Sequence, residues 1–177
     1  MVRPIRAHEW REIRALRLKA LQDESAPLAF VESYEKGAAQ PDEFWQGRAQ
    51  ASSSDAGPGA AACQFVAIAD DGTWVGTSVA LIEKAGEHDF EGKTIEQSGG
   101  HVVGVFLQPE HRGKGVIGRV LDATLDWMRQ RDLPRARLYV HADNLRAQRA
   151  YEKAGFTATG TSVHGSLGHE IEMARAL

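Results

Sequence analysis

The sequence predicts an α+β domain in which helices flank a mixed β-sheet. A strand–helix–strand unit lies at residues 101–141, and such a unit joins two parallel strands. Hairpin-type strand pairs precede and follow this unit, and the strands of a hairpin are antiparallel. Two helices come before these strands, so helices and strands do not alternate as in a doubly wound fold. A length of 177 residues fits a single domain over 1–177.

The first half of the chain has the pattern of two helices followed by a hairpin. Trp10, Ile13 and Leu16 begin an apolar series at three- and four-residue steps, which predicts an amphipathic helix. Two acids after Pro41 suit the positive end of a helix dipole, and Asp70-Asp71-Gly72 is a hairpin-type turn. We therefore expect a helix over 7–23, a helix from Pro41, strands over 63–69 and 73–82, and an acidic segment over 85–100 that is a loop or contains a short edge strand.

The second half carries the crossover and a terminal hairpin. Pro109 stops a strand, and Asn144 and Gly155 are typical of an N-cap and of the C′ position of one helix. We expect a strand over 101–107, a helix over 114–131, a strand over 137–141, a helix from Asn144 to Gly155, and a hairpin after it.

Composition narrows the classes of partner. The chain has 21 Lys+Arg against 24 Asp+Glu, a net charge of −3, so we expect no nucleic-acid partner. The single cysteine, Cys63, cannot form an internal disulfide, which fits a reducing compartment. The sequence shows no apolar run of the ~20 residues that span a bilayer and no signal peptide at its start, so we expect a cytoplasmic protein without a membrane partner. The oligomeric state stays open, a homodimer included.

A basic, glycine-rich turn precedes the helix at 114–131. Amide groups at a helix start point at an anion, and glycines let the backbone approach it closely. The turn therefore predicts a diphosphate site, although a basic turn without a ligand remains an alternative. The glycines are Gly113, Gly115 and Gly118, and the cations are Arg112, Lys114 and Arg119.

Two nucleotide motifs fit this turn less well. Gly113, Gly115 and Gly118 match the dinucleotide pattern G-x-G-x-x-G, with Asp143 as a possible ribose ligand. In that fold the strand runs directly into the first glycine, whereas residues 108–112 intervene here. A Walker A loop is excluded because Lys114 is followed by glycine instead of Ser or Thr.

Two segments together resemble the GNAT superfamily of N-acetyltransferases. Residues 105–115, VFLQPEHRGKG, resemble its acetyl-CoA-binding motif, and residues 144–156, NLRAQRAYEKAGF, resemble its second signature. One position departs, because Ile117 stands where the family has Gly or Ala. Either its amide still donates to a phosphate while its side chain lies on the core face, or Gly118 takes over this position with a slight shift of the helix start. The resemblance covers the whole chain and implies a mostly antiparallel mixed sheet with splayed central strands flanked by helices.

The resemblance also implies acetyl-CoA as cosubstrate, with no metal. The pantetheine arm would pair with the backbone of Val105, Phe106 and Leu107, and an amide near Phe106 or Leu107 would stabilise charge on the carbonyl oxygen. Asn144 would both cap its helix and contact the arm. The diphosphate would lie on Arg112, Gly113, Lys114, Gly115, Val116, Ile117, Gly118 and Arg119.

The same resemblance suggests catalytic residues. Tyr151 matches the general acid that protonates the leaving thiolate, although a core tyrosine is the alternative. His101 is the candidate base, because four and six residues separate it from Val105 and Leu107, which places all three on one strand face. Its position also matches a catalytic glutamate of some members, and a purely structural histidine is the alternative. Glu83, Glu32 and water are the other candidates for the base.

The predicted activity is direct acetyl transfer to a primary amine of a small molecule or a peptide N-terminus. Cys63 is disfavoured as an acyl carrier because it lies in an apolar strand without an evident base. The acids of 85–100 hint at a cationic acceptor. The alternative is a catalytically silent module that binds acyl-CoA, and the departure from the family motif at Ile117 favours it. Three histidines match no metal-ligand spacing: His141, His164 and His169.

Overall fold

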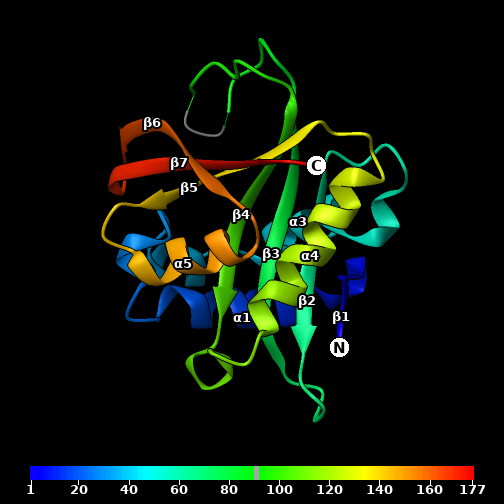
Figure 1. Cartoon of the computed structure of the whole chain (residues 1–177). Helices are drawn as coiled ribbons and strands as arrows, with labels where there is room; N and C mark the ends of the chain where they lie inside the picture. Colours follow the sequence, from blue (N-terminus) through cyan, green and yellow to red (C-terminus); the bar gives the residue numbers. More distant parts are fainter. Residues whose placement is uncertain (90–91) are drawn as a thin grey trace.

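The computed structural model describes residues 1–89 and 92–177. These residues contain a seven-stranded sheet in the order β1-β2-β3-β4-β5-β7-β6 (Figure 1). The parallel contact in it is the one between β4 and β5, and every other neighbouring pair is antiparallel. The mixed, mostly antiparallel sheet flanked by helices is therefore confirmed. The strands are β1 Val2–Pro4, β2 Ala62–Ile68, β3 Trp74–Glu83, β4 Gly99–Leu107, β5 Arg135–His141, β6 Thr157–Gly165 and β7 Gly168–Ala176.

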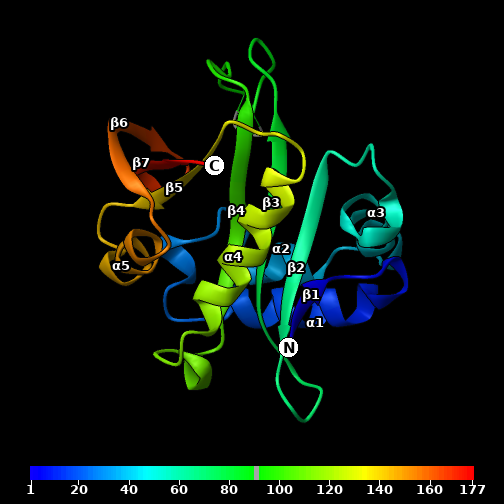
Figure 2. The same cartoon turned by 45° about the vertical axis from the view of Figure 1, so that its right-hand side comes forward.

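Helices cover both faces of the sheet (Figure 2). The helices α4 and α5 lie on one face, and the amino-terminal helices lie on the other. Each face has its own apolar core: Leu121 and Leu125 of α4 lie in the first, and Ile13 and Leu16 of α1 lie in the second with Trp45 of α3. The helices are α1 Trp10–Leu21, α2 Tyr34–Ala38, α3 Asp42–Ser52, α4 Val116–Arg129 and α5 Leu145–Lys153.

The expected elements are present, with two additions. The first helix begins with a 3₁₀ turn, Ala7–Glu9, before α1. The strand β1 and the helix α2 were not expected, because three and five residues are too few to show a period. Tertiary contacts define β1, since Arg3 lies opposite Val66 in the sheet. The segment 85–100 is mainly loop with one isolated bridge, His88 to Thr94, and its residues 90–91 lie outside the described part.

Candidate functional site

A groove opens between the two parallel strands at the centre of the sheet. The β4–β5 ladder consists of Gly100 opposite Ala136 and His101 opposite Arg137, at the start of both strands. Beyond these pairs β4 and β5 diverge, so the backbone of β4 after His101 faces β5 without a ladder. An extended ligand can pair with such an unoccupied edge. The expected splayed central strands are present.

A β-bulge at Gly104 changes which way β4 side chains point. The register between β3 and β4 shifts between Thr77 and Val79, and Gly104 has a φ of 61°, which favours glycine. As a result Val102 and Leu107 both lie in the core beneath α4, although an odd number of positions separates them. A bulge leaves an unpaired backbone position, and here it lies within the groove wall.

The bulge makes one sequence argument wrong. Counting alternate residues along the strand predicts that His101 shares a face with Val105 and Leu107. Gly100, its neighbour, faces Met128 of α4, so His101 points to the opposite face. Leu107 and Val105 pack on the α4 core. His101 therefore does not share a face with them.

The groove is lined by five segments of the chain. Its β4 wall runs from Val102 to Val105, including Gly104. Asn144 lies at the start of α5, where its Oδ1 accepts the amide hydrogen of Ala147 at 3.2 Å, so the expected N-cap is confirmed. The sequence did not indicate the remaining walls, which come from distant segments. These are Leu28 and Ala29 before α2, Tyr139 and Val140 on β5, and Glu170 on β7.

The glycine-rich turn follows β4 and leads into α4. Gly113 and Gly115 have φ values of 75° and 71°, and Gly115 is the N-cap of α4. The first amides of a helix have no acceptor within the helix, so those of Val116, Ile117 and Gly118 are available to a ligand. The side chain of Ile117 packs against the core, as expected, which leaves its amide exposed to the turn.

The three cations of the turn differ in their contacts. Arg112 donates through Nε to the Leu107 carbonyl at 3.0 Å and forms an ion pair with Asp23 at 2.5 Å. It therefore ties the segment after α1 to the end of β4. Lys114 and Arg119 are exposed, and within the described residues neither forms an ion pair. The positive charge of the turn that is not neutralised by an ion pair within the described residues is that of Lys114 and Arg119.

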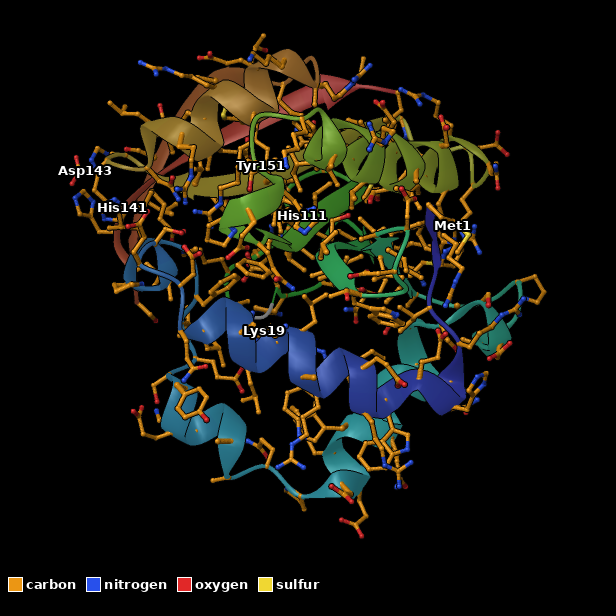
Figure 3. The ribbon with its side chains drawn as sticks, turned by 90° about the horizontal axis from the view of Figure 1, so that it is seen from below. Met1, Lys19, His111, His141, Asp143 and Tyr151 are labelled. Atoms are coloured by element: carbon orange, nitrogen blue, oxygen red, sulfur yellow. The ribbon has the colours of Figure 1, made fainter. Side chains whose placement is uncertain are left out.

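Tyr151 projects from α5 into the groove, between α5 and β4 (Figure 3). The side chain is buried, at 8% exposure, with Phe156 edge-on at 6.2 Å between ring centroids. Burial raises the pKa of its phenol, so the proton stays on oxygen throughout the neutral range. In the part of the chain that the structure describes, no protein group forms a hydrogen bond with this phenol. The Tyr151 phenol is therefore protonated and available to donate a hydrogen bond to a ligand in the groove.

His101 belongs to a buried ionic network instead of the groove lining. Its Nδ1 lies 2.8 Å from Oε1 of Glu83, and Arg137 donates to both Glu83 oxygens at 2.7 Å. Burial alone would raise the pKa of Glu83, but the hydrogen bonds from His101 and Arg137 lower it to about 2. A carboxylate this acidic is a poor base, and Glu32 is held by Arg17 at 3.0 Å. The geometry speaks against both carboxylate alternatives.

Other polar residues are accounted for structurally. Burial raises the pKa of Cys63 to about 11, so its thiol is not nucleophilic at neutral pH. The side chain of Asp89, in the acidic segment, is 3% exposed and faces Arg137 at 3.5 Å, so it offers no charge to a cationic acceptor. His164 and His169 stack across the terminal hairpin. Among the described residues no cluster of three His, Cys, Asp or Glu could hold a metal ion.

The mostly antiparallel sheet, in which two parallel strands diverge, thus offers an unpaired strand edge and a set of free helix amides. The sequence matches the acetyltransferase (GNAT) family over residues 15–156. The chain therefore belongs to the GNAT family of acetyltransferases, and the expected family is confirmed. Over 76 residues the chain is 33% identical to a mycothiol acetyltransferase of Beutenbergia cavernae. The aligned segment makes up 43% of this chain and 25% of that protein.

Solved structures share the fold over the full chain. A ribosomal-protein-S5-alanine acetyltransferase of Vibrio fischeri has a TM-score of 0.73 at 21% identity, covering 99% of this chain and 91% of its own. A phosphinothricin acetyltransferase of Sinorhizobium meliloti, solved with acetyl-CoA, has a TM-score of 0.71 at 16% identity, covering 100% and 88%. At these identities the likeness concerns the fold alone.

Proposed function

We propose that this chain transfers an acetyl group from acetyl-CoA directly to a primary amine of a small molecule or a peptide N-terminus. The observation that supports this most is the β4–β5 groove, which is lined by the buried Tyr151, together with the free amides at the start of α4, the helix that follows β4. The solved neighbours include both a protein-alanine and a small-molecule acetyltransferase by name, so both kinds of acceptor belong to the proposal.

Acetyl-CoA supplies an activated acetyl group as a thioester. The backbone of β4 from Val105 to Leu107 faces the groove and would bind the pantetheine arm as an added strand does. The turn amides of residues 113–118, with Lys114 and Arg119, would hold the diphosphate, and Asn144 at the opposite wall would contact the arm. Arg112 contributes by fixing the turn to Asp23. No metal ion is part of the proposal.

Two residues would transfer protons in the proposed reaction, one as general acid and one as base. Tyr151 would donate to the sulfur as the thiolate leaves, and its raised pKa requires that the proton moves while the C–S bond breaks. A backbone amide at the end of β4 would stabilise negative charge on the carbonyl oxygen. His101 is the proposed base. Since Glu83 fixes its Nδ1 and His101 does not line the groove, it would act on the amine through water.

The proposal also covers the setting of the enzyme. Among the described residues no helix is long and apolar enough to cross a membrane. Together with one buried cysteine, this supports a cytoplasmic enzyme without nucleic-acid or membrane partners, as a monomer or a homodimer. The alternative is a silent acyl-CoA-binding module, and the packing of the Ile117 side chain against the core supports a role for its amide in holding the diphosphate in either case.

Calorimetric titration with acetyl-CoA, followed by a thiol-release assay with an amine panel, tests the function. We expect saturable binding and thiol release that depends on the amine. Absence of binding at millimolar acetyl-CoA would overturn the proposal. Binding without release on any amine would support the silent module instead.

A further inference from the structure

A second pocket lies on the other side of the Gly104 bulge, beneath α1. Gly104 belongs to the walls of both the groove and this pocket, so the two meet at the bulge. The pocket is narrow, with room for about one water-sized group, so it would take the polar head of a ligand. Its walls are Ile13, Leu16, Arg17 and Ala20 of α1, Arg48 of α3, Gln64 of β2, Thr77 and Val79 of β3, and Gly104.

The pocket contains more positive than negative charge. Arg17 is paired with Glu32 at 3.0 Å and stacks over the ring of Phe30 at 4.4 Å. Arg48 is half-buried and, within the described part of the chain, forms no hydrogen bond or ion pair through its side chain. Burial, and then the charge of Arg17, lower the pKa of Arg48. Two guanidinium groups thus face a single carboxylate, and one cation is left to be neutralised.

The pocket also contains an unpaired acceptor. Gln64 is 5% exposed, and its Nε2 donates to the Thr77 hydroxyl at 3.0 Å. Thr77 in turn donates to the Phe65 carbonyl at 2.8 Å, which fixes the direction of these hydrogen bonds. Among the described residues the buried Oε1 of Gln64 has no partner. Leaving such an oxygen without a donor costs about 1–3 kcal/mol, so the site is incomplete without a ligand or water.

A ligand that satisfies both groups carries an anion and an N–H close together. We propose that this pocket binds a free amino acid, with its carboxylate on Arg48 and an amine N–H on Oε1 of Gln64, as the acceptor in the reaction. The inference rests on the proposed function, and it narrows the acceptor to amines that carry a nearby carboxylate. It replaces the cationic acceptor that the acidic segment had suggested. It also disfavours peptide N-termini, whose carboxylate is remote.

Matched acceptor pairs test the proposal. Straight-chain and α-amino acids are compared with their carboxamides, first by kcat/KM in the thiol-release assay and then by calorimetric binding to the enzyme without acetyl-CoA. We expect at least one acid to exceed its amide about tenfold or more in both measurements, because a charge-assisted hydrogen bond is lost in the amide.

Variants separate recognition from folding. Arg48→Gln should abolish the acid-to-amide ratio, and Arg48→Lys should restore part of it, whereas Arg129→Gln on the exposed end of α4 should leave it unchanged. Equal values for every wild-type pair, or a ratio that survives Arg48→Gln, would overturn the inference. If Arg48→Gln does not fold, the wild-type ratio decides. If acetyl-CoA does not bind, the proposed function fails, while calorimetry of the free enzyme still tests the pocket.

Discussion

The two sides of the Gly104 bulge are built from different parts of the chain. On the groove side, the groups proposed to hold the coenzyme are mainly backbone amides of one contiguous stretch, which runs from the end of β4 through the glycine-rich turn to the first turn of α4. On the α1 side, the polar groups are the side chains of Arg17, Arg48 and Gln64, which come from α1, α3 and β2. Backbone groups can bind one coenzyme whatever the side chains are. Recognition of different acceptors depends on the identity of side chains.

Under the two proposals, this difference separates the residues that would hold the coenzyme from those that would select the acceptor. Arg48 and Gln64 lie outside the turn, so their variation would change the choice of acceptor without loss of coenzyme binding. The bulge connects the two because Gly104 forms a wall of both. Variants on either side should therefore affect different kinetic constants.

The largest expected effect is at Tyr151, on the groove side. Tyr151→Phe should lower kcat by about 100-fold, the usual contribution of a general acid, with no change in the Kd of acetyl-CoA. The phenol has no hydrogen-bond partner in the described part of the chain, so its loss leaves no orphaned group and the fold should persist. Stopped-flow thiol release and calorimetry measure the two quantities. Tyr34→Phe, at the exposed start of α2, is the control. An unchanged kcat in Tyr151→Phe would remove Tyr151 from its role.

A second effect concerns the buried ionic network of His101, Glu83 and Arg137, beside the β4–β5 ladder. The folded pKa of Glu83 is about 2, below its ordinary value of 4.5, so its stabilisation is present above about pH 4.5 and is lost as pH falls toward 2. Glu83→Gln should cost about 3 kcal/mol at pH 7, because Arg137 and His101 lose their buried partner. Chemical denaturation at pH 7 and pH 3 should show a difference that shrinks in acid. Glu87→Gln, exposed in the following loop, should change little, and overlapping curves for Glu83→Gln and wild type would contradict the expectation.

The sequence allowed the groove side to be predicted because its signals are local. Glycines with positive φ at 113 and 115, the N-cap Asn144 and the C′ glycine Gly155 each act within a few residues of chain. The inward direction of Ile117 follows from the helix period. Such features depend on neighbours in sequence, so one sequence is enough to place them.

The acceptor side could not be predicted because its contacts are long-range. Arg48 and Gln64 have no periodic or motif signal, and they meet only when α3 and β2 pack together. The wrong prediction that His101 shares a strand face with Val105 and Leu107 has the same origin. The bulge at Gly104 that reverses the alternation is visible only in the pairing of β4 with β3. A glycine flanked by valines within a strand is the one signal that would have suggested it.

A smaller effect tests the backbone character of the groove side. At Gly115, with a φ of 71°, a β-branched side chain costs about 1–2 kcal/mol, so Gly115→Val should weaken acetyl-CoA binding about tenfold by displacing the turn. The Kd from calorimetry and the Tm are the measurements. Gly47→Ala, in α3 with nothing near the added Cβ, should leave the Kd unchanged. Equal Kd values for Gly115→Val and wild type would show that the amides of the turn do not hold the diphosphate.

The smallest expected effect distinguishes direct transfer from a covalent route. Cys63 lies in β2 within the α4 core, at 2% exposure, and its pKa of about 11 keeps it protonated at pH 8. Native protein should therefore resist thiol reagents at pH 8, and Cys63→Ala should keep kcat within about twofold, because removing a buried thiol changes packing and not chemistry. Alkylation before and after denaturation serves as the internal control. If Cys63→Ala remains folded by circular dichroism but loses turnover, the acetyl group passes through the thiol, and the amine does not attack the thioester directly.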